Sequence, residues 1–330
     1  MELFNLLKEG SDRSMPKLNT HLYFAKEISD SVAPAKLRNL LKEYRPEFLL
    51  GNIFPDIFYY SFRKKNISVS DHIHGENGIK TNKLIFDILD IAKERGEHRL
   101  LVFVWGMLAH FALDAKIHPL VYYLTGNYYD HDTQRRVGAV RQHFEFEVVL
   151  DMAISKENYL ENFNANLYES EVFALLADLF QKMQIRKKEI VRFTKRAILI
   201  ESRIVYSRAV YKLVRLLEKS GIIEKKYSAL FYPKRKNNLI SLSKKIEFHH
   251  PITGYLSKRG ILDLLQEAQE EFLKKMNVAH DYYLGKINRR DGNKVITGEN
   301  LNFGQEGVWA KDAKFFLKSG NWRDVYLENK

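Results

Sequence analysis

The chain has 330 residues, a formal net charge of +12 and no cysteine, which excludes disulfides and leaves nitrogen and oxygen atoms as the available metal ligands. No apolar run reaches the length of a membrane span, the best candidate being near residues 100–112, and the first ten residues lack the apolar core of a secretory signal. We therefore expect a cytoplasmic protein with no transmembrane segment, long enough for one large or two modest domains.

Most of the predicted elements, in chain order, are helices. Apolar residues recur with helical spacing over residues 17–31, 35–44, 81–94, 134–154, 168–183, 184–220 and 261–283. A further helix, apolar on its flanks, passes through residues 100–118 and should bend or end there, because Pro119 lacks an amide donor. Residues 224–250 are irregular and basic, and the last 45 or so residues have little periodicity. The sequence therefore predicts an all-α, multi-helix bundle with an irregular C-terminal tail.

Three polar side chains interrupt the apolar helix near its C-terminal end: His110, Asp114 and His118. At about 100° per residue they fan across roughly 80° of one helix face. A buried helix carries such groups only when they have partners, and imidazole and carboxylate groups aimed the same way are typical of a metal site. The alternative is a hydrogen-bonded His–Asp pair in the core.

Other residues of ligand type occur in the same half of the chain. They are His21, Asp56, His72, His74, His143 and Glu147. The pair His143 and Glu147 repeats the four-residue spacing of His110 and Asp114, which lets two ligands from one helix reach one ion. One such pair is also a common surface ion pair. Two pairs in apolar helices, with the additional histidines and Asp56, supply enough ligands for two or three metal ions.

The order of these residues resembles a known family. The matching pattern is His21, Pro55-Asp56, His72-x-His74, His110-x-x-x-Asp114, His118-Pro119 and His143-x-x-x-Glu147. With these residues in this order, the sequence over about residues 15–155 resembles the bacterial zinc-dependent phospholipase C family. The turn that begins His250-Pro251 is similar to the later part of cytoplasmic members of that family. The all-helical fold of that family is shared with the fungal single-strand nucleases.

The resemblance implies how the ligands divide among zinc ions. The first ion would be held by Asp56, His110 and either His72 or His74. Asp114 would bridge that ion to another. The second ion would be held by His118, His143 and Glu147, and His21 would belong to a third. In secreted members an N-terminal tryptophan completes the third site, but no tryptophan precedes His21 here. Two zinc ions are therefore expected, and a third only if other groups replace that tryptophan.

The resemblance also implies an activity: a zinc-dependent phosphodiesterase that cleaves a phospholipid or a related phosphodiester with metal-activated water. Asp56 is the predicted catalytic residue, both binding zinc and orienting the attacking water. One alternative is a single-strand nuclease or a generic phosphohydrolase, because the same fold hosts both substrates. Another is a non-catalytic helical scaffold that keeps zinc and binds anionic membranes.

Positive charge is concentrated in one region of the chain. Residues 182–245 hold 19 lysines and arginines against four acids, so the rest of the chain sums to −3. This region suggests peripheral contact with an anionic membrane, nucleic acid or a phosphorylated substrate, although solvated basic faces of long helices explain it equally well. We divide the chain into a zinc-binding, phospholipase C-like core over residues 1–160 and a basic helical region over residues 161–330, packed on the same body.

Overall fold

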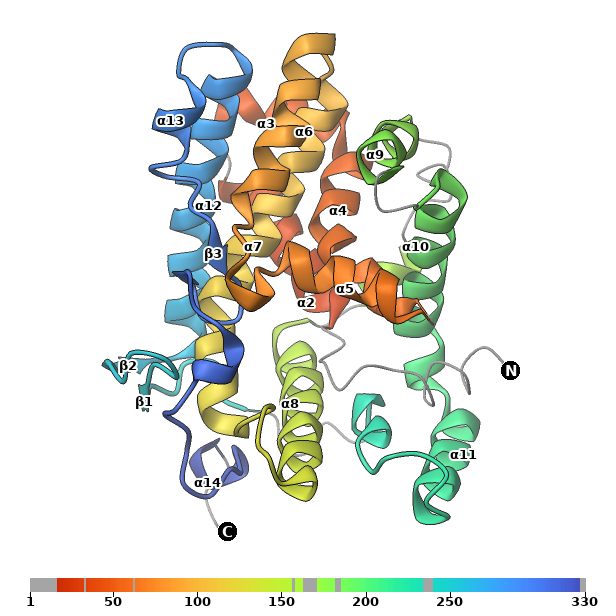
Figure 1. Ribbon diagram of the computed structural model, residues 1–330. Helices are drawn as coiled ribbons and strands as arrows, with labels where there is room; N and C mark the ends of the chain where they lie inside the picture. Colours follow the sequence, from red (N-terminus) through yellow and green to blue (C-terminus); the bar gives the residue numbers. More distant parts are fainter. Residues whose placement is uncertain are drawn as a thin grey trace.

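The computed structural model describes residues 17–32, 34–61, 63–155, 158–162, 171–181, 185–233 and 240–326. The α-helices in these ranges are α2 (Leu18–Glu27), α3 (Ala35–Glu43), α4 (Arg45–Ile53), α5 (Lys64–Ile73), α6 (Asn82–Arg95), α7 (His98–Thr125), α8 (Thr133–Ile154), α9 (Val172–Phe180), α10 (Lys187–Ser202), α11 (Arg208–Lys219), α12 (Ile261–Tyr283), α13 (Arg289–Gly292) and α14 (Arg323–Tyr326) (Figure 1). Short helical turns are η1 (Ile28–Val32), η2 (Phe54–Tyr60), η3 (Glu76–Gly78), η4 (Tyr159–Asn162), η7 (Ile204–Tyr206), η8 (Tyr227–Leu230) and η9 (Ala310–Asp312).

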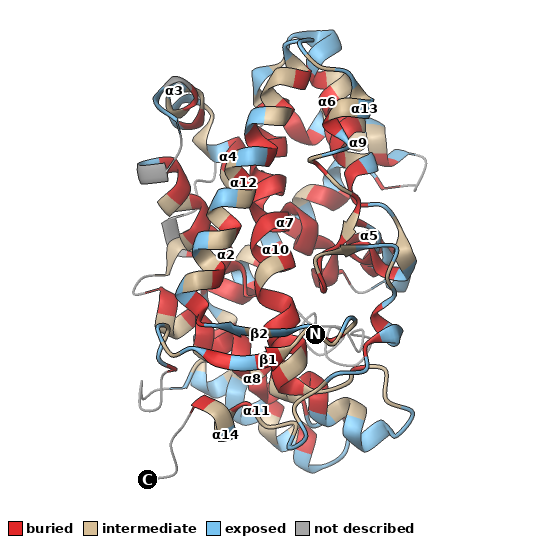
Figure 2. Cartoon of the chain, turned by 90° about the vertical axis from the view of Figure 1, so that its left-hand side faces the viewer, coloured by how far each residue is buried: buried red, intermediate tan, exposed pale blue. Residues whose placement is uncertain are grey.

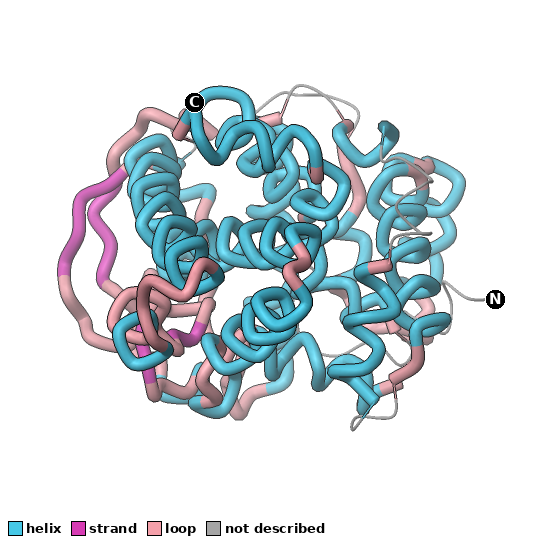
Figure 3. Tube along the Cα trace, turned by 90° about the horizontal axis from the view of Figure 1, so that it is seen from above, coloured by secondary structure: helices cyan, strands magenta, loops and turns pink. Residues whose placement is uncertain are grey.

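The strands in the described ranges form two small antiparallel hairpins at the edge of the body (Figure 3). They are β1 (Ile246–His249) with β2 (Leu256–Arg259), and β3 (Glu299–Asn300) with β4 (Gln305–Glu306). The predicted all-α class is therefore confirmed.

Helix α7 runs through the centre of the bundle. It packs against α4, α12, α6, α8 and α2 (Figure 1). Nearly all of its residues are buried (Figure 2). Trp105 and Leu108 have no exposed surface. A helix that is apolar on all sides is stable in water only when other elements surround it, so this sequence dictates a central position.

Helices α4 and α7 cross in close contact through a pair of glycines. A Cβ atom on Gly51 would lie 2.0 Å from the carbonyl oxygen of Phe103, and one on Gly106 would lie 2.1 Å from that of Phe48. No larger residue fits at either position without moving a helix. The close approach brings the C-terminal end of α4, and the following turn η2, against the part of α7 that carries the polar residues.

The sequence predicts that this helix bends or ends near His118; it does not end there, and α7 continues through Pro119 to Thr125. Leu120, Val121 and Leu124, which follow the proline, have no exposed surface. Their burial outweighs the one backbone hydrogen bond that a proline removes. The carbonyl of Ala115, which lacks its usual amide partner, faces Gly304, where a Cβ atom would lie 2.6 Å from the oxygen.

The same helix is long and apolar enough to cross a membrane, with a mean hydropathy of 1.6 over its best window. The expectation that no run reaches this length was wrong, because the apolar stretch does not stop at the proline. Within the described residues, 94% of that window is buried by the rest of the protein. Length and composition are weak grounds for a membrane span when a helix is covered in this way.

The basic region is divided differently from its sequence prediction. The helix expected over residues 184–220 is interrupted: α10 ends at Ser202 and α11 begins at Arg208. Ser207 starts the second helix, because its hydroxyl accepts a hydrogen bond from the amide of Val210 at 3.4 Å. Residues 224–250, expected to be irregular, contain η8 and β1.

One hydrophobic core includes residues from both halves of the chain. The ring of Phe58 contacts those of Phe180 and Phe193, and Trp322 in the C-terminal tail contacts Phe146 of α8. The tail also reaches the polar centre, since the amide of Leu301 donates to the carbonyl of His74 at 2.9 Å. The division near residue 160 stays a prediction.

Candidate metal centre

Eight of the nine candidate ligands lie in one connected group of side chains. They are His21, Asp56, His74, His110, Asp114, His118, His143 and Glu147, and all are buried. They come from α2, η2, the C-terminal end of α5, α7 and α8. His72 is exposed and is not in the group. Of the two histidines that the sequence left open, the structure therefore brings His74 to the centre.

The first part of the group consists of Asp56, His74 and His110. The Nε2 atom of His74 lies 3.1 Å from Oδ1 of Asp56 and 3.3 Å from Nε2 of His110. On the far side of each ring, Nδ1 of His74 contacts the carbonyl of Ser70 at 2.7 Å, and Nδ1 of His110 contacts the carbonyl of Asn52 at 2.8 Å. A carbonyl only accepts, so both Nδ1 atoms carry hydrogen, and both Nε2 atoms point inwards.

Two inward-facing Nε2 atoms at 3.3 Å need a positive charge between them, because neutral rings of this tautomer would place two lone pairs face to face. Burial lowers the pKa of His74, but the neighbouring carboxylates of Asp114 and Asp56 outweigh it and hold that pKa well above its usual value. Burial and the neighbouring His21 lower the pKa of His110. The pKa values of these two adjacent rings are thus shifted in opposite directions.

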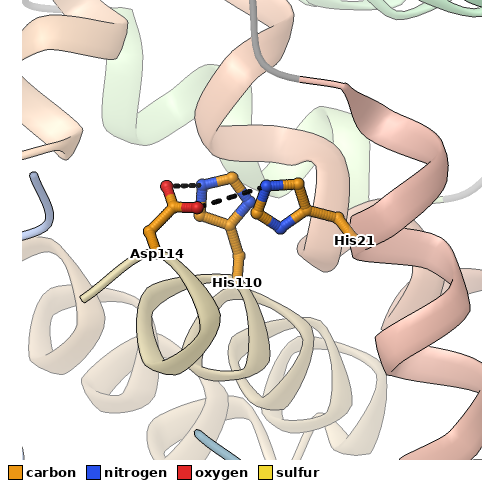
Figure 4. Close-up of side chains that lie close together, drawn as sticks. All are labelled: His21, His110 and Asp114. Atoms are coloured by element: carbon orange, nitrogen blue, oxygen red, sulfur yellow. Dashed lines mark ion pairs between the residues drawn. The ribbon is translucent and has the colours of Figure 1, made fainter. Parts of the chain in front are cut away.

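Asp114 lies between two sets of imidazoles. Its Oδ2 atom is 3.1 Å from Nε2 of His110 and 3.6 Å from Nε2 of His74. Its Oδ1 atom is 3.2 Å from Nε2 of His21 and 3.6 Å from Nε2 of His118. The ring of His21 stacks on that of His110 with centroids 4.1 Å apart (Figure 4). Each carboxylate oxygen thus faces a different set of nitrogen ligands, which is the arrangement a bridging ligand requires.

The other part of the group consists of His118, His143 and Glu147, in which α8 faces α7. Oε1 of Glu147 lies 2.7 Å from Nε2 of His143 and 3.7 Å from Nε2 of His118. Burial raises the pKa of Glu147 to about 7, although His118 partly offsets it. Burial and the charge of His118 hold the pKa of His143 well below its usual value. Burial therefore disfavours the charged form of both Glu147 and His143.

The donor set fits zinc. Several buried atoms in the group have no hydrogen-bond partner: both carboxylate oxygens of Asp56, Oδ2 of Asp114, Oε2 of Glu147, and Nδ1 of His21, His118 and His143. Burying carboxylate oxygens without donors is costly, and a bound cation removes that cost. Imidazole and carboxylate ligands suit zinc, and the carbonyls behind His74 and His110 are the outer partners that zinc-binding histidines usually have.

A second polar cluster, missed in the sequence, lies beside His21. Asp151 of α8 is buried and accepts hydrogen bonds from the Thr20 hydroxyl at 2.5 Å and from the Tyr232 hydroxyl. Burial raises the pKa of Asp151, against these hydrogen bonds. Asp151 lies four residues after Glu147 on the same helix face, and this spacing in the sequence could have identified it as a further polar residue near the ligands. Asp151 is outside the three groups whose atoms are close enough to share an ion.

A cavity of about 30 Å³ opens on the polar centre between α2, α7 and α8. Its lining includes His21, Asp114, His118 and Glu147, together with Lys17, whose ammonium group is held by Glu201 at 3.2 Å. A cavity of this volume has room for water beside the candidate ligands.

Comparison with known proteins gives one match. The family model described as zinc dependent phospholipase C matches residues 20–207, which include all the grouped side chains. No curated protein and no solved structure matches the chain.

Proposed function

This chain belongs to the zinc-dependent phospholipase C family, and on that premise we propose that it is a hydrolase of phospholipids or related phosphodiesters. The observation that carries the proposal is the carboxylate of Asp114, whose two oxygens face two different sets of imidazole nitrogens. Phosphodiester hydrolysis uses such paired metal sites, and a single structural zinc needs no bridging carboxylate.

The residues present would hold two ions. Asp56, His74 and His110 would hold the first, and Asp114 would join it to the second. The second would be held by His118, His143 and Glu147. Zinc bound here would lower the pKa of water to about 7 and neutralise charge on the phosphoryl oxygens. The place of His21 against Oδ1 of Asp114 is open to a third ion, with groups other than a tryptophan completing it.

Asp56 is the proposed catalytic carboxylate. It is fully buried, neither of its oxygens has a hydrogen-bond partner, and Oδ1 lies 3.1 Å from Nε2 of His74. A carboxylate with a free lone pair at this place can orient the attacking water and accept its proton. His74 and His110 hold the centre in position, because backbone carbonyls lock both rings from behind.

The proposal is tested by metal content followed by turnover. Elemental analysis of the purified protein should find two or more zinc ions per chain. Headgroup release from phosphatidylcholine, hydrolysis of a chromogenic phosphodiester and cleavage of single-stranded DNA then separate the substrate classes. The matched control is His72→Ala, because His72 is exposed and close in sequence to a ligand. One zinc per chain with no turnover on any substrate would favour the non-catalytic scaffold.

A further inference from the structure

Helix α11 leaves part of its apolar face uncovered. At about 100° per residue, Val214 and Glu218 share the face turned towards the protein, and both are buried. Leu213 and Leu216 lie on the next face and are 53% and 63% exposed. Two leucines exposed to this extent on one helix, both outside the metal centre, are not needed for the core.

A row of basic side chains runs beside these leucines. Arg208, Lys212, Arg215 and Lys219 lie within about 60° of one another on α11. Glu218, the one acid in the helix, is buried, and its Oε2 atom lies 3.5 Å from Arg215. The exposed surface of α11 is therefore both apolar and cationic.

The same helix borders a cavity larger than the one at the polar centre. This cavity has a volume of about 540 Å³ and is lined by Tyr211 and Lys212 of α11, by Val148 of α8 and by Phe231 and Tyr232. Its wall is mostly aromatic and aliphatic, and α11 contributes Arg208, Tyr211 and Lys212 to it. The hydroxyl of Tyr232, which lines this cavity, reaches Asp151, one helical turn beyond Glu147 on α8.

We propose that α11 docks the protein on an anionic phospholipid bilayer. Leu213 and Leu216 enter the boundary between headgroups and acyl chains, and the basic row contacts the headgroup phosphates. An amphipathic helix with leucine on one face and Lys or Arg beside it binds membranes through both effects. The proposal goes beyond the proposed function and does not depend on it.

Other occupants of this face fit less well. In a two-fold dimer the same patch meets itself, so the basic rows of two copies would repel each other. Nucleic acid would engage the basic row, but it offers nothing for Leu213 and Leu216, because single strands stack on aromatic rings. An anionic bilayer offers apolar acyl chains to Leu213 and Leu216 and phosphate groups to the basic row.

A polarity-sensitive fluorophore tests the docking directly. The chain has no cysteine, so Leu213→Cys can be labelled at one place. We expect water-like emission in the free protein and a blue shift on addition of phosphatidylcholine vesicles that contain phosphatidylserine. The matched control is Leu262→Cys, which is 49% exposed on α12, at the other side of the body from α11, and should not shift (Figure 1). Apolar emission before vesicles are added would mean that this face is already covered, and would overturn the proposal.

Vesicle sedimentation measures the two contributions separately, and it is read before headgroup release becomes detectable. Removing two charges with Lys212→Gln and Lys219→Gln should weaken binding roughly 25-fold at low salt, at about fivefold per charge. Replacing the exposed pair with Leu213→Ser and Leu216→Ser should weaken it at least tenfold at any salt concentration.

The control Lys258→Gln, on the exposed β2 strand, should bind as the wild type does. The proposal is wrong if the wild type ignores phosphatidylserine, if the α11 variants bind equally well, or if light scattering finds a dimer that the serine variants dissociate. Because no readout uses turnover, these results are independent of the proposed hydrolase activity.

Discussion

Replacing Asp114 by Asn is the sharpest perturbation of the proposed two-ion centre. The carboxylate has one oxygen for each set of nitrogens, at 3.1 and 3.6 Å on one side and at 3.2 and 3.6 Å on the other. An amide keeps one oxygen and places an NH₂ group on the other side, where it can only donate. The variant should therefore lose the bridge while filling the same volume.

The size of the effect follows from this geometry. Loss of an outer partner of a metal ligand already costs about 10–100-fold in metal affinity or activity. Asp114 is itself a direct neighbour of both sets of ligands, so its loss should exceed that range for at least one ion. We expect a decrease in affinity of more than about 100-fold, or about 2.7 kcal/mol. The three remaining ligands in each part should still retain some zinc.

The assay is zinc content and affinity, measured by equilibration against metal buffers with a chromophoric chelator. Asp151→Asn is the matched control, because Asp151 is also a buried carboxylate near His21 but lies outside the groups that can share an ion. Thermal unfolding of both metal-free variants shows whether either simply fails to fold. Unchanged zinc stoichiometry and affinity in folded Asp114→Asn would refute the bridging role.

Four further results are expected. Asp56→Asn should lower turnover roughly 10²–10⁴-fold with part of the zinc retained, and full turnover with full zinc content would show that another group is the base. His74→Ala should lower zinc content by elemental analysis while His72→Ala leaves it unchanged, and the reverse order would contradict the structure. Gly51→Ala should lower the free energy of unfolding, measured in denaturant, by about 1–3 kcal/mol. The control Gly138→Ala adds a Cβ atom with no neighbour within 4 Å and should raise it by about 0.5–1 kcal/mol. Equal effects of the two substitutions would argue against the close helix crossing. Zinc affinity should fall as the pH is lowered, because protonated imidazole cannot bind zinc, and the fall should begin above about pH 6.5, because the pKa of His74 is held well above that ordinary value; calorimetry in two buffers should find proton release, whose absence would argue against histidine ligands.

Local sequence signals predicted the helices that are regular along their whole length. The apolar periodicity over residues 261–283 corresponds to α12 with the same bounds. Of the bend or end predicted at Pro119, the end did not occur, because packing outweighed the local preference. The single helix predicted over residues 184–220 was wrong, because a capping residue, Ser207, divides it. Propensity and periodicity act over a few residues, but the burial that keeps α7 helical beyond its proline comes from elements distant in sequence.

The two histidines near the end of α5 show which part of the site could not be predicted from the sequence. His72 and His74 are two residues apart and chemically identical, so composition and spacing cannot show which of them is the ligand. The helix ends at Ile73, and Gly75 follows with a φ of 77°, so the chain reverses just after His74. Only His74 then faces the centre, with its Nδ1 atom held by the carbonyl of Ser70.

The sequence by itself determined the chemistry available: no sulfur ligands, imidazole and carboxylate pairs four residues apart, and apolar helices to carry them. Spacing along one helix is a local property, so His110 and Asp114 were certain to share a face. Only the tertiary structure decided which helices meet and which atoms face inwards. The crossing at Gly51 and Gly106 brings the Asn52 carbonyl behind His110, where it contacts Nδ1 of the ring. Because every residue has a carbonyl, no sequence pattern shows which carbonyl will contact a given histidine.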